Sequence, residues 1–265
     1  MSTYTKDSEE GIAMNITWDE NEYEKNFSFV HQYGQDVLGL LDVPQGSTVL
    51  DLGCGNGALT QALAEAGYQA IGLDDSAEML AAARKAHPGL DLIHANAIGF
   101  TLDSPVDAIF SNAVLHWIDK KDQPALLASV FRALKPGGEF VFECGGVGNA
   151  QLIHSALAEA FKERNRAYTV DKYFPSIGEY AAMLEDVGFK VVFATLFDRF
   201  TPLAGENGLV DWITLFQSNS FEGMNEQEKE AIIQEAVEAI RSELYVDGTW
   251  HADYVRLRMK AIKPE

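Results

Sequence analysis

The chain is poor in cysteine and has no histidine pair at metal-ligand spacing. Its two cysteines, Cys54 and Cys144, lie far apart and form no Cys-x-x-Cys pair. A disulfide framework is therefore unsupported, and a reducing cytoplasm suits the chain. None of the six histidines stands in a His-x-x-x-His arrangement, so we predict no metal site.

Basic residues and long apolar runs are scarce as well. The 20 Lys and Arg residues face 40 Asp and Glu residues, which gives a formal net charge of −20. Such a chain, with no cluster of Lys and Arg, repels phosphate backbones, so we expect neither DNA nor RNA as a partner. The N-terminal residues are too polar and acidic for a signal peptide, and no apolar stretch is long enough to span a membrane. We expect a cytoplasmic protein without a membrane partner, and nothing in the sequence indicates an oligomeric state.

The alternation of apolar runs and helical patterns indicates an α/β fold. A chain of 265 residues with 47% hydrophobic content can bury the core of one large domain, or of a domain with a lid. Strands are predicted over 48–51, 69–74, 91–94, 108–112 and 139–144, with helices between them. Ser76 is placed to cap the helix that carries Met79. This order predicts a parallel sheet covered on both faces, with ligands at the carboxyl ends of the strands.

Other elements flank this alternating region. The patterns predict helices over 20–41, 151–166, 177–187 and 226–244, with Gly188 closing the third of these. They also predict strands over 190–197 and 254–262.

The strongest local signal is a glycine-rich turn between the first strand and its helix. Residues 49–57 read VLDLGCGNG, so the strand ends near Asp51, and Gly53, Gly55 and Gly57 follow. Glycine tolerates positive φ and lets a ligand approach the backbone, and the first amides of the next helix suit an anionic group. A dinucleotide fingerprint fits only in part, because Gly57 is an extra glycine. The second strand ends in Asp74, whose carboxylate can accept two hydrogen bonds from ribose hydroxyls.

Four motifs together resemble those of class I S-adenosylmethionine-dependent methyltransferases. They are residues 51–57 (DLGCGNG), 72–76 (GLDDS) with Met79, 107–113 (DAIFSNA) and 134–140 (LKPGGEF), in the order typical of the family. Residues Trp18, Tyr23 and Phe27, the segment 115–118 (LHWI) and the segment 211–213 (DWI) are similar to the trans-aconitate methyltransferase, or methyltransferase type 11, subgroup. That subgroup methylates small carboxylic acids.

The resemblance implies a Rossmann-like, seven-stranded, mostly parallel sheet with an antiparallel last strand beside the sixth, and a helical lid. The whole chain 1–265 is then a single methyltransferase domain. Its expected parts are an N-terminal lid helix (16–34), a cofactor-binding core (35–150), helical lid insertions (151–187 and 203–248) and the last sheet strands (188–202 and 249–265).

The resemblance also assigns S-adenosylmethionine as the cofactor and gives roles to residues that would bind it. Asp51 orients the cofactor's amino group, the three glycines admit its amino-acid end and sugar, and Asp74 holds the ribose. Asp75, Met79, Asn96 and Ala97 lie near the adenine, and Asn112 and Ala113 lie near the methyl group. In the family an acid often stands near position 96 and holds the adenine amino group; the amide oxygen of Asn96 can accept the same bond. Each of these residues also has a purely structural alternative, as a turn, a cap or core packing.

The candidates at the acceptor are more dispersed. His116 lies just past the fourth strand, where it could bind a substrate carboxylate, act as a base or serve as a structural histidine. Tyr23, Phe27 and His31 are lid candidates, and Trp117, Tyr173, Arg199 and Trp212 are further candidates for contact with a small-molecule substrate.

The predicted reaction is methyl transfer to a small molecule, with O-methylation of a carboxylate favoured. An ionised carboxylate needs no general base, and alignment with exclusion of water supplies much of the catalysis. Three alternatives stay open: methylation of another O, N or C acceptor, a non-catalytic protein that binds S-adenosylmethionine, and a nicotinamide-dependent oxidoreductase on a similar sheet.

Overall fold

The computed structural model describes residue 34 and residues 36–265. The candidates Tyr23, Phe27 and His31, and all of the expected lid helix 16–34 except its last residue, lie outside the described residues. In the described part, no helix is long and apolar enough to cross a membrane.

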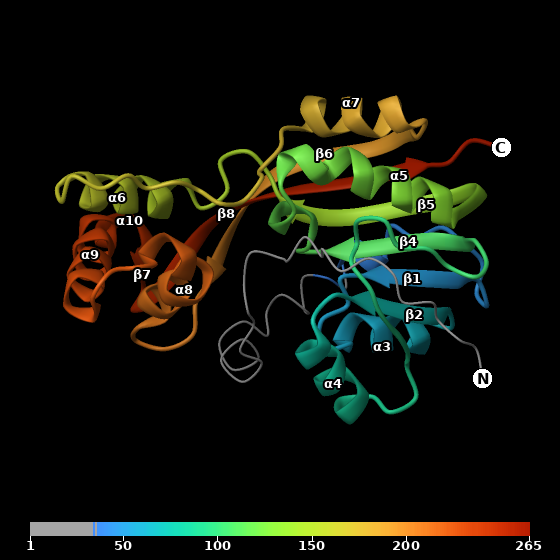
Figure 1. The fold of residues 1–265 in the computed structure, drawn as a ribbon, viewed down its shortest axis with the longest axis horizontal. Coiled ribbons are helices and arrows are strands. Elements are labelled where there is room, and N and C mark those ends of the chain that lie inside the picture. Colours follow the sequence, from blue (N-terminus) through green and yellow to red (C-terminus); the bar gives the residue numbers. More distant parts are fainter. Residues whose placement is uncertain (1–33, 35) are drawn as a thin grey trace.

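The fold is built on one mixed sheet with the strand order β3-β2-β1-β4-β5-β8-β6 (Figure 1). The strands are β1 (Thr48–Leu52), β2 (Gln69–Asp74), β3 (Asp91–His94), β4 (Val106–Asn112), β5 (Leu134–Gly145), β6 (Lys190–Pro202) and β8 (Thr249–Ile262). The first five pair in parallel, and β8 runs antiparallel between β5 and β6. This confirms the Rossmann-like fold expected from the sequence. An eighth strand, β7 (Tyr245–Val246), pairs with the start of β8.

The register brings the ends of the parallel strands to one edge. Asp51 pairs with Gly72 on one side and with Phe110 on the other, and Asn112 pairs with Glu143. Because the carboxyl ends of parallel strands meet at one edge, the ends of β1, β2, β4 and β5 form a continuous rim.

Successive side chains of each strand point to opposite faces of the sheet, and both faces carry apolar side chains. Helices therefore cover both faces. Helices α5 (Gln123–Ala133) and α7 (Ile177–Val187) pack on the face that carries Leu50 and Leu52. Helix α3 (Ala58–Glu65) packs on the opposite face against Val49 and Phe110. Helix α4 (Ala77–Ala86) follows β2.

The helix ends follow the local sequence. The Ser76 hydroxyl accepts a hydrogen bond from the Met79 N–H, as predicted. Helix α7 has the predicted bounds, and Gly188 ends it with φ 109°, a conformation that glycine adopts without strain.

Three predicted helices differ from the structure. The helix predicted over 151–166 ends at Lys162. The helix predicted to reach residue 41 ends near Leu38, where Gly39 and a turn lead the chain toward Pro44. The helix predicted over 226–244 divides at Ile240 into α9 (Glu226–Ala239) and α10 (Arg241–Leu244). The break lets both Ile240 and Leu244 enter one apolar cluster and turns the chain into β7.

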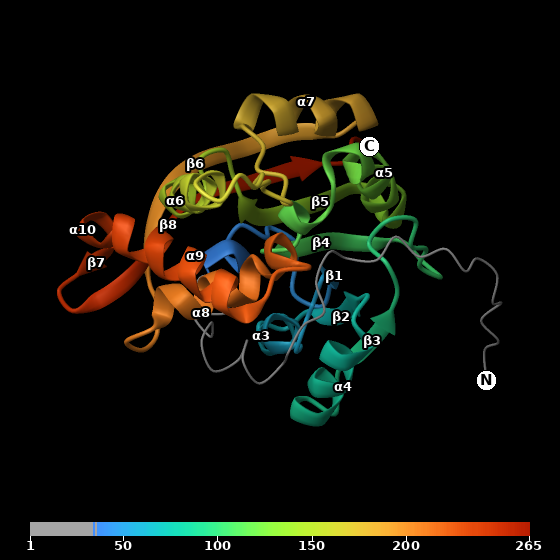
Figure 2. The ribbon, with the colours of Figure 1, turned by 60° about the vertical axis from the view of Figure 1, so that its left-hand side comes forward.

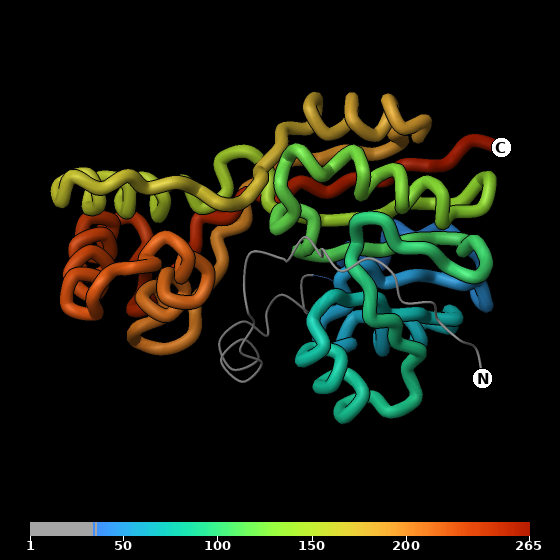
Figure 3. Tube along the Cα trace, viewed as in Figure 1, coloured from blue at the N-terminus to red at the C-terminus, as the bar shows by residue number. Residues whose placement is uncertain are grey.

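The remaining helices gather at one end of the molecule (Figures 1 and 2). There α6 (Gln151–Lys162), α8 (Gly208–Phe216), α9 and α10 share an apolar cluster with the first residues of β8. Strands β6 and β8 are longer than predicted, and their outer ends carry these helices away from the sheet (Figure 3). Helix α7, although it lies inside the expected lid segment 151–187, packs on α5 and β6 instead. The candidate site lies at the rim, where the two groups of elements meet.

Candidate functional site

Two adjoining cavities lie at the carboxyl ends of the parallel strands. The larger has about 1090 Å³ of empty space, its open mouth included, and the smaller about 510 Å³. The two cavities share Gly53, Asp74, Val114 and Trp117.

The glycine turn forms one wall of the larger cavity. Gly53 has φ 78°, and a Cβ there would lie 2.3 Å from Cγ2 of Val114, so no other residue fits. Gly55 also lines the cavity, beside the terminal methyl of Met79. Gly57 is the N-cap of α3 and packs toward α4, and it is not among the residues that line the cavity.

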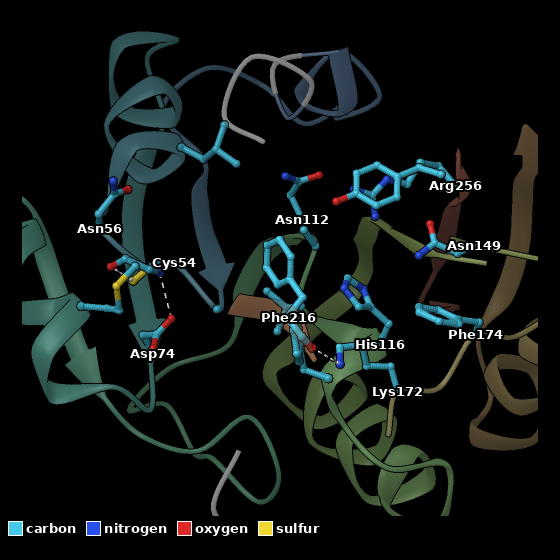
Figure 4. Close-up of a pocket in the computed structure, with 18 of the residues that line it drawn as sticks. Cys54, Asn56, Asp74, Asn112, His116, Asn149, Lys172, Phe174, Phe216 and Arg256 are labelled. Atoms are coloured by element: carbon cyan, nitrogen blue, oxygen red, sulfur yellow. Dashed lines mark hydrogen bonds between the residues drawn. The ribbon is translucent and has the colours of Figure 1, made fainter. Parts of the chain in front are cut away.

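Two buried carboxylates lie at the ends of the first two strands. Asp51 is 1% exposed, and the Thr60 hydroxyl donates to its Oδ2 at 2.7 Å. Burial, aided by the nearby charge of Asp74, raises the pKa of Asp51 to about 7. Asp74 accepts from the Gly55 N–H at Oδ2 at 2.8 Å (Figure 4). It also accepts from the Ser76 N–H at Oδ1 at 2.8 Å. These bonds fix the Asp74 carboxylate and leave it further lone pairs. Burial raises the pKa of Asp74 as well.

The smaller cavity has mostly apolar walls and an acidic edge. Asp75, Asn96 and Ala97 line it, as do Asp119 and Asp122. The Asn96 side-chain amide donates to Oδ2 of Asp75 at 2.7 Å, and its oxygen accepts from the Ile98 N–H at 2.8 Å. The side chain of Asn96 therefore braces the loop after β3.

These features fit S-adenosylmethionine. A buried carboxylate (Asp51) suits its ammonium group, the glycine backbone admits its amino-acid end, and Asp74 at the junction of the cavities suits its ribose. The smaller, apolar cavity beyond Asp74 suits a flat base.

The other side of the larger cavity is formed by residues that follow β4. Asn112 and Ala113 line it, and Ala113 has φ 61°, held by its N–H bond to the Glu143 carbonyl. The His116 ring also lines the cavity, and its Nδ1 accepts a hydrogen bond from the Gly145 N–H at 3.2 Å. Burial, with the charges of Arg256 and Lys172, holds the pKa of His116 well below its usual value of 6.5. His116 is therefore neutral with its proton on Nε2, so Nε2 can donate a hydrogen bond but cannot accept a proton.

Two cations in this cavity had no recognisable signal in the sequence. Arg256 on β8 is 7% exposed, stacks on the Tyr254 ring at 4.4 Å and lines the cavity (Figure 4). Its Nε is buried without a hydrogen-bond partner in the described residues. Lys172 bonds to Asp171 and to the Phe216 carbonyl.

The buried carboxylate of Glu143 lies near three arginines, and one of them, Arg256, lines the cavity. Arg199 bonds to both of its oxygens, and Arg258 donates two bonds to Oε2. The Arg256 Nε lies 4.0 Å from Oε1 of Glu143, too far for a hydrogen bond. One carboxylate thus faces three guanidinium groups, which leaves excess positive charge at this side of the cavity.

The structure brings only some of the predicted acceptor residues into the cavity. Trp117 and Trp212 line it. Tyr173 and Arg199 line neither cavity: the Tyr173 hydroxyl points to Met183, and Arg199 is held by Glu143. Further lining residues that the sequence did not indicate are Cys54, Asn56, Leu59, Val114, Asn149, His154, Lys172, Phe174, Phe216, Tyr254 and Arg256. Within the described residues, no group of three or more His, Cys, Asp or Glu could hold a metal ion.

Comparison with known proteins agrees with this geometry. The profile of a family described as "Methyltransferase domain" matches residues 49–138. An uncharacterized methyltransferase of Schizosaccharomyces pombe is 31% identical over 93% of this chain and 98% of its own. A trans-aconitate 2-methyltransferase of Acidovorax is 37% identical over 74% of this chain and 78% of its own.

A solved structure shares the fold. Phosphoethanolamine N-methyltransferase 2 of Haemonchus contortus, in complex with phosphomonomethylethanolamine and S-adenosylhomocysteine, superposes with a TM-score of 0.58 at 19% identity, covering 92% of this chain and 57% of that one. The glycine turn, the two carboxylates and the relatives lead to one conclusion: the chain belongs to the class I S-adenosylmethionine-dependent methyltransferases.

Proposed function

We propose that this methyltransferase methylates a carboxylate oxygen of a small-molecule acid. The observation that carries the proposal is Arg256, a guanidinium group that lines the cavity while its buried Nε has no partner in the described residues. A buried charged donor is unfavourable without an acceptor. A carboxylate matches the planar fork of a guanidinium group and would supply that acceptor.

The charges around Arg256 support an anionic acceptor. Glu143 is already bonded to Arg199 and Arg258, so it does not also neutralise Arg256, whose Nε lies 4.0 Å from its Oε1. Lys172 lines the same cavity, but its ammonium group is paired with Asp171, so the excess charge comes from the arginines around Glu143. The excess positive charge attracts an anion into this cavity even though the whole chain has a net charge of −20.

The state of His116 agrees with an acceptor that is already ionised. When bound, S-adenosylmethionine supplies an electrophilic methyl group on a sulfonium. The carboxylate oxygen forms the new O–CH₃ bond, and the S–CH₃ electron pair stays on sulfur, so no proton moves. His116 is a neutral donor rather than a base; its Nε2–H orients the carboxylate, and the aromatic walls exclude water.

The cofactor residues take the roles expected from the family likeness. Asp51 holds the ammonium group, and Asp74 holds the ribose hydroxyls at the junction of the cavities. Asn112 lies between the cofactor end of the cavity and His116, where the methyl group would lie (Figure 4), and Ala113 follows it in the cavity wall. The relatives named trans-aconitate 2-methyltransferases, whose name indicates a carboxylic acid substrate, support the same acceptor class.

A screen for methyl transfer tests the proposal. The protein is incubated with S-adenosylmethionine labelled in its methyl group and with panels of small carboxylic acids, their amides, phenols and amines. We expect base-labile methyl esters from acids and no product from the matching amides. Turnover of phenols or amines without acids would contradict the proposal, and binding of S-adenosylhomocysteine without turnover of any acceptor would favour a non-catalytic binding protein.

Variants then test the role of Arg256. Arg256→Gln should raise KM for the acid by roughly 10- to 100-fold, because a charge-assisted hydrogen bond is lost, while the affinity for S-adenosylhomocysteine stays the same. Arg199→Gln is the matched control, since Arg199 pairs with the same Glu143 but lines neither cavity. An equal rise of KM in both variants would show that Arg256 acts only through the Glu143 cluster.

A further inference from the structure

The smaller cavity contains a carboxylate oxygen that the described chain does not use. Oδ2 of Asp122 is buried and has no hydrogen-bond partner in the described residues, and Asp122 lines this cavity. The residue is the N-cap of α5, yet its side chain accepts no capping hydrogen bond from that helix. A buried carboxylate oxygen without a donor is unfavourable, so a donor on a bound group would stabilise it.

The residue that the family likeness suggested for the adenine amino group already makes two hydrogen bonds within the chain. The oxygen of Asn96 accepts from the Ile98 N–H, and its amide nitrogen donates to Asp75. These bonds hold the side chain in the loop after β3. Asp122 lines the same cavity from a different element, the start of α5.

We propose that Asp122 accepts a hydrogen bond from the 6-amino group of the cofactor's adenine. Asp74 lies in both cavities, so a ribose bound there directs the base into the smaller one. The walls of that cavity include Leu73, Ala97 and Ile118, which suit the faces of a purine. The N-terminal end of α5 stabilises the negative charge of Asp122 while it accepts the bond. The inference rests on the cofactor of the family and not on the proposed acceptor.

Calorimetric titration with two ligands tests this assignment. The first is S-adenosylhomocysteine, and the second is its analogue in which the 6-amino group is replaced by hydrogen. The wild-type protein should bind the first about 10- to 100-fold more tightly, as expected for a hydrogen bond to a charged group. Asp122→Ala should bring the two dissociation constants to within roughly threefold of each other, by weakening only S-adenosylhomocysteine.

Two further variants make the result decisive. Asp122→Asn keeps an acceptor oxygen without the charge and should give an intermediate ratio; it also serves if the alanine variant is poorly folded. Asp119→Ala is the matched control, because Asp119 lines the same cavity but does not lack a partner. Its Oδ2 lies 3.4 Å from Nζ of Lys121, and its side chain is 47% exposed. It should keep the wild-type ratio. A wild-type protein with no preference, or a preference that survives in Asp122→Ala, would overturn the proposal.

Discussion

Asp51→Asn should stabilise the cofactor-free protein at neutral pH, although it removes a carboxylate that the cofactor needs. Asp51 is 1% exposed, and a hydroxyl is the only side-chain group whose bond to it is described. Burial raises its pKa from 3.8 to about 7. Ionised Asp51 is therefore unfavourable in the folded protein until a cation binds beside it.

The size of the effect follows from the two pKa values. In the unfolded chain Asp51 loses its proton near pH 3.8, so the folded state holds one more proton up to about pH 7. Stability falls as the pH rises through this range, by about 1.4 kcal/mol per pH unit, and the total loss is about 4 kcal/mol. Asparagine does not titrate. The advantage of the variant should therefore grow by about 1.5 kcal/mol between about pH 5.5 and about pH 7, and level off above that.

Urea unfolding of the wild type and of Asp51→Asn between about pH 5.5 and about pH 7 measures the difference in their free energies of unfolding. The difference between variant and wild type cancels the titration of the groups that do not interact with Asp51. Asp107→Asn is the control: Asp107 is weakly buried, and its bonds to Lys135 and the Thr48 N–H outweigh burial and lower its pKa. Its substitution should therefore not stabilise the protein. An Asp51→Asn advantage that is absent, or equal at the two ends of the range, would refute the reasoning.

Cofactor binding should reverse the effect. A bound ammonium group lowers the pKa of Asp51, so S-adenosylhomocysteine should bind the wild type with release of a proton at about pH 6. Calorimetry in buffers of different ionisation enthalpy measures that release. The Asp51→Asn variant should bind S-adenosylhomocysteine more weakly and release no proton from residue 51.

Three further variants have expected outcomes. Asp74→Asn should raise the dissociation constant of S-adenosylhomocysteine by about 100-fold, because an amide group must then face one of two N–H donors; an unchanged constant in calorimetry would contradict this. Gly53→Ala should destabilise the protein by about 2–5 kcal/mol in urea unfolding, since its Cβ would meet Val114 and its φ is 78°; a stable variant would show that the turn can rearrange. Glu143→Gln should cost about 3–5 kcal/mol by leaving three arginines without their carboxylate, and high salt should restore part of that loss.

The sequence predicted the cofactor half of the site because its residues lie in consecutive motifs. Each strand end carries its own polar residue, and the parallel order alone brings Asp51, Asp74 and Asn112 to one rim. The predicted bounds of β2, β3 and α7 agree with the structure, since turn residues or caps mark their ends.

The acceptor half could not be predicted in the same way. Arg256 meets Glu143 only because β8 lies antiparallel between β5 and β6, with Arg256 opposite Gly145. Nothing near Arg256 in the sequence marks that register. Arg199 was the arginine that the sequence suggested, and only the pairing of β6 with β8 places it against Glu143, outside the cavity. Lys172 and His154 enter the cavity from segments that follow the sheet core.

The position of β8 between β5 and β6 also affects how the chain folds during its synthesis. The facing edges of β5 and β6 are unpaired until β8 is present between them. Helices α6, α8, α9 and α10 also pack on the first residues of β8. Until residue 262 has left the ribosome, two long edges stay open to other chains. A nascent chain of this protein should therefore depend on chaperones until β8 has been made and has paired with β5 and β6.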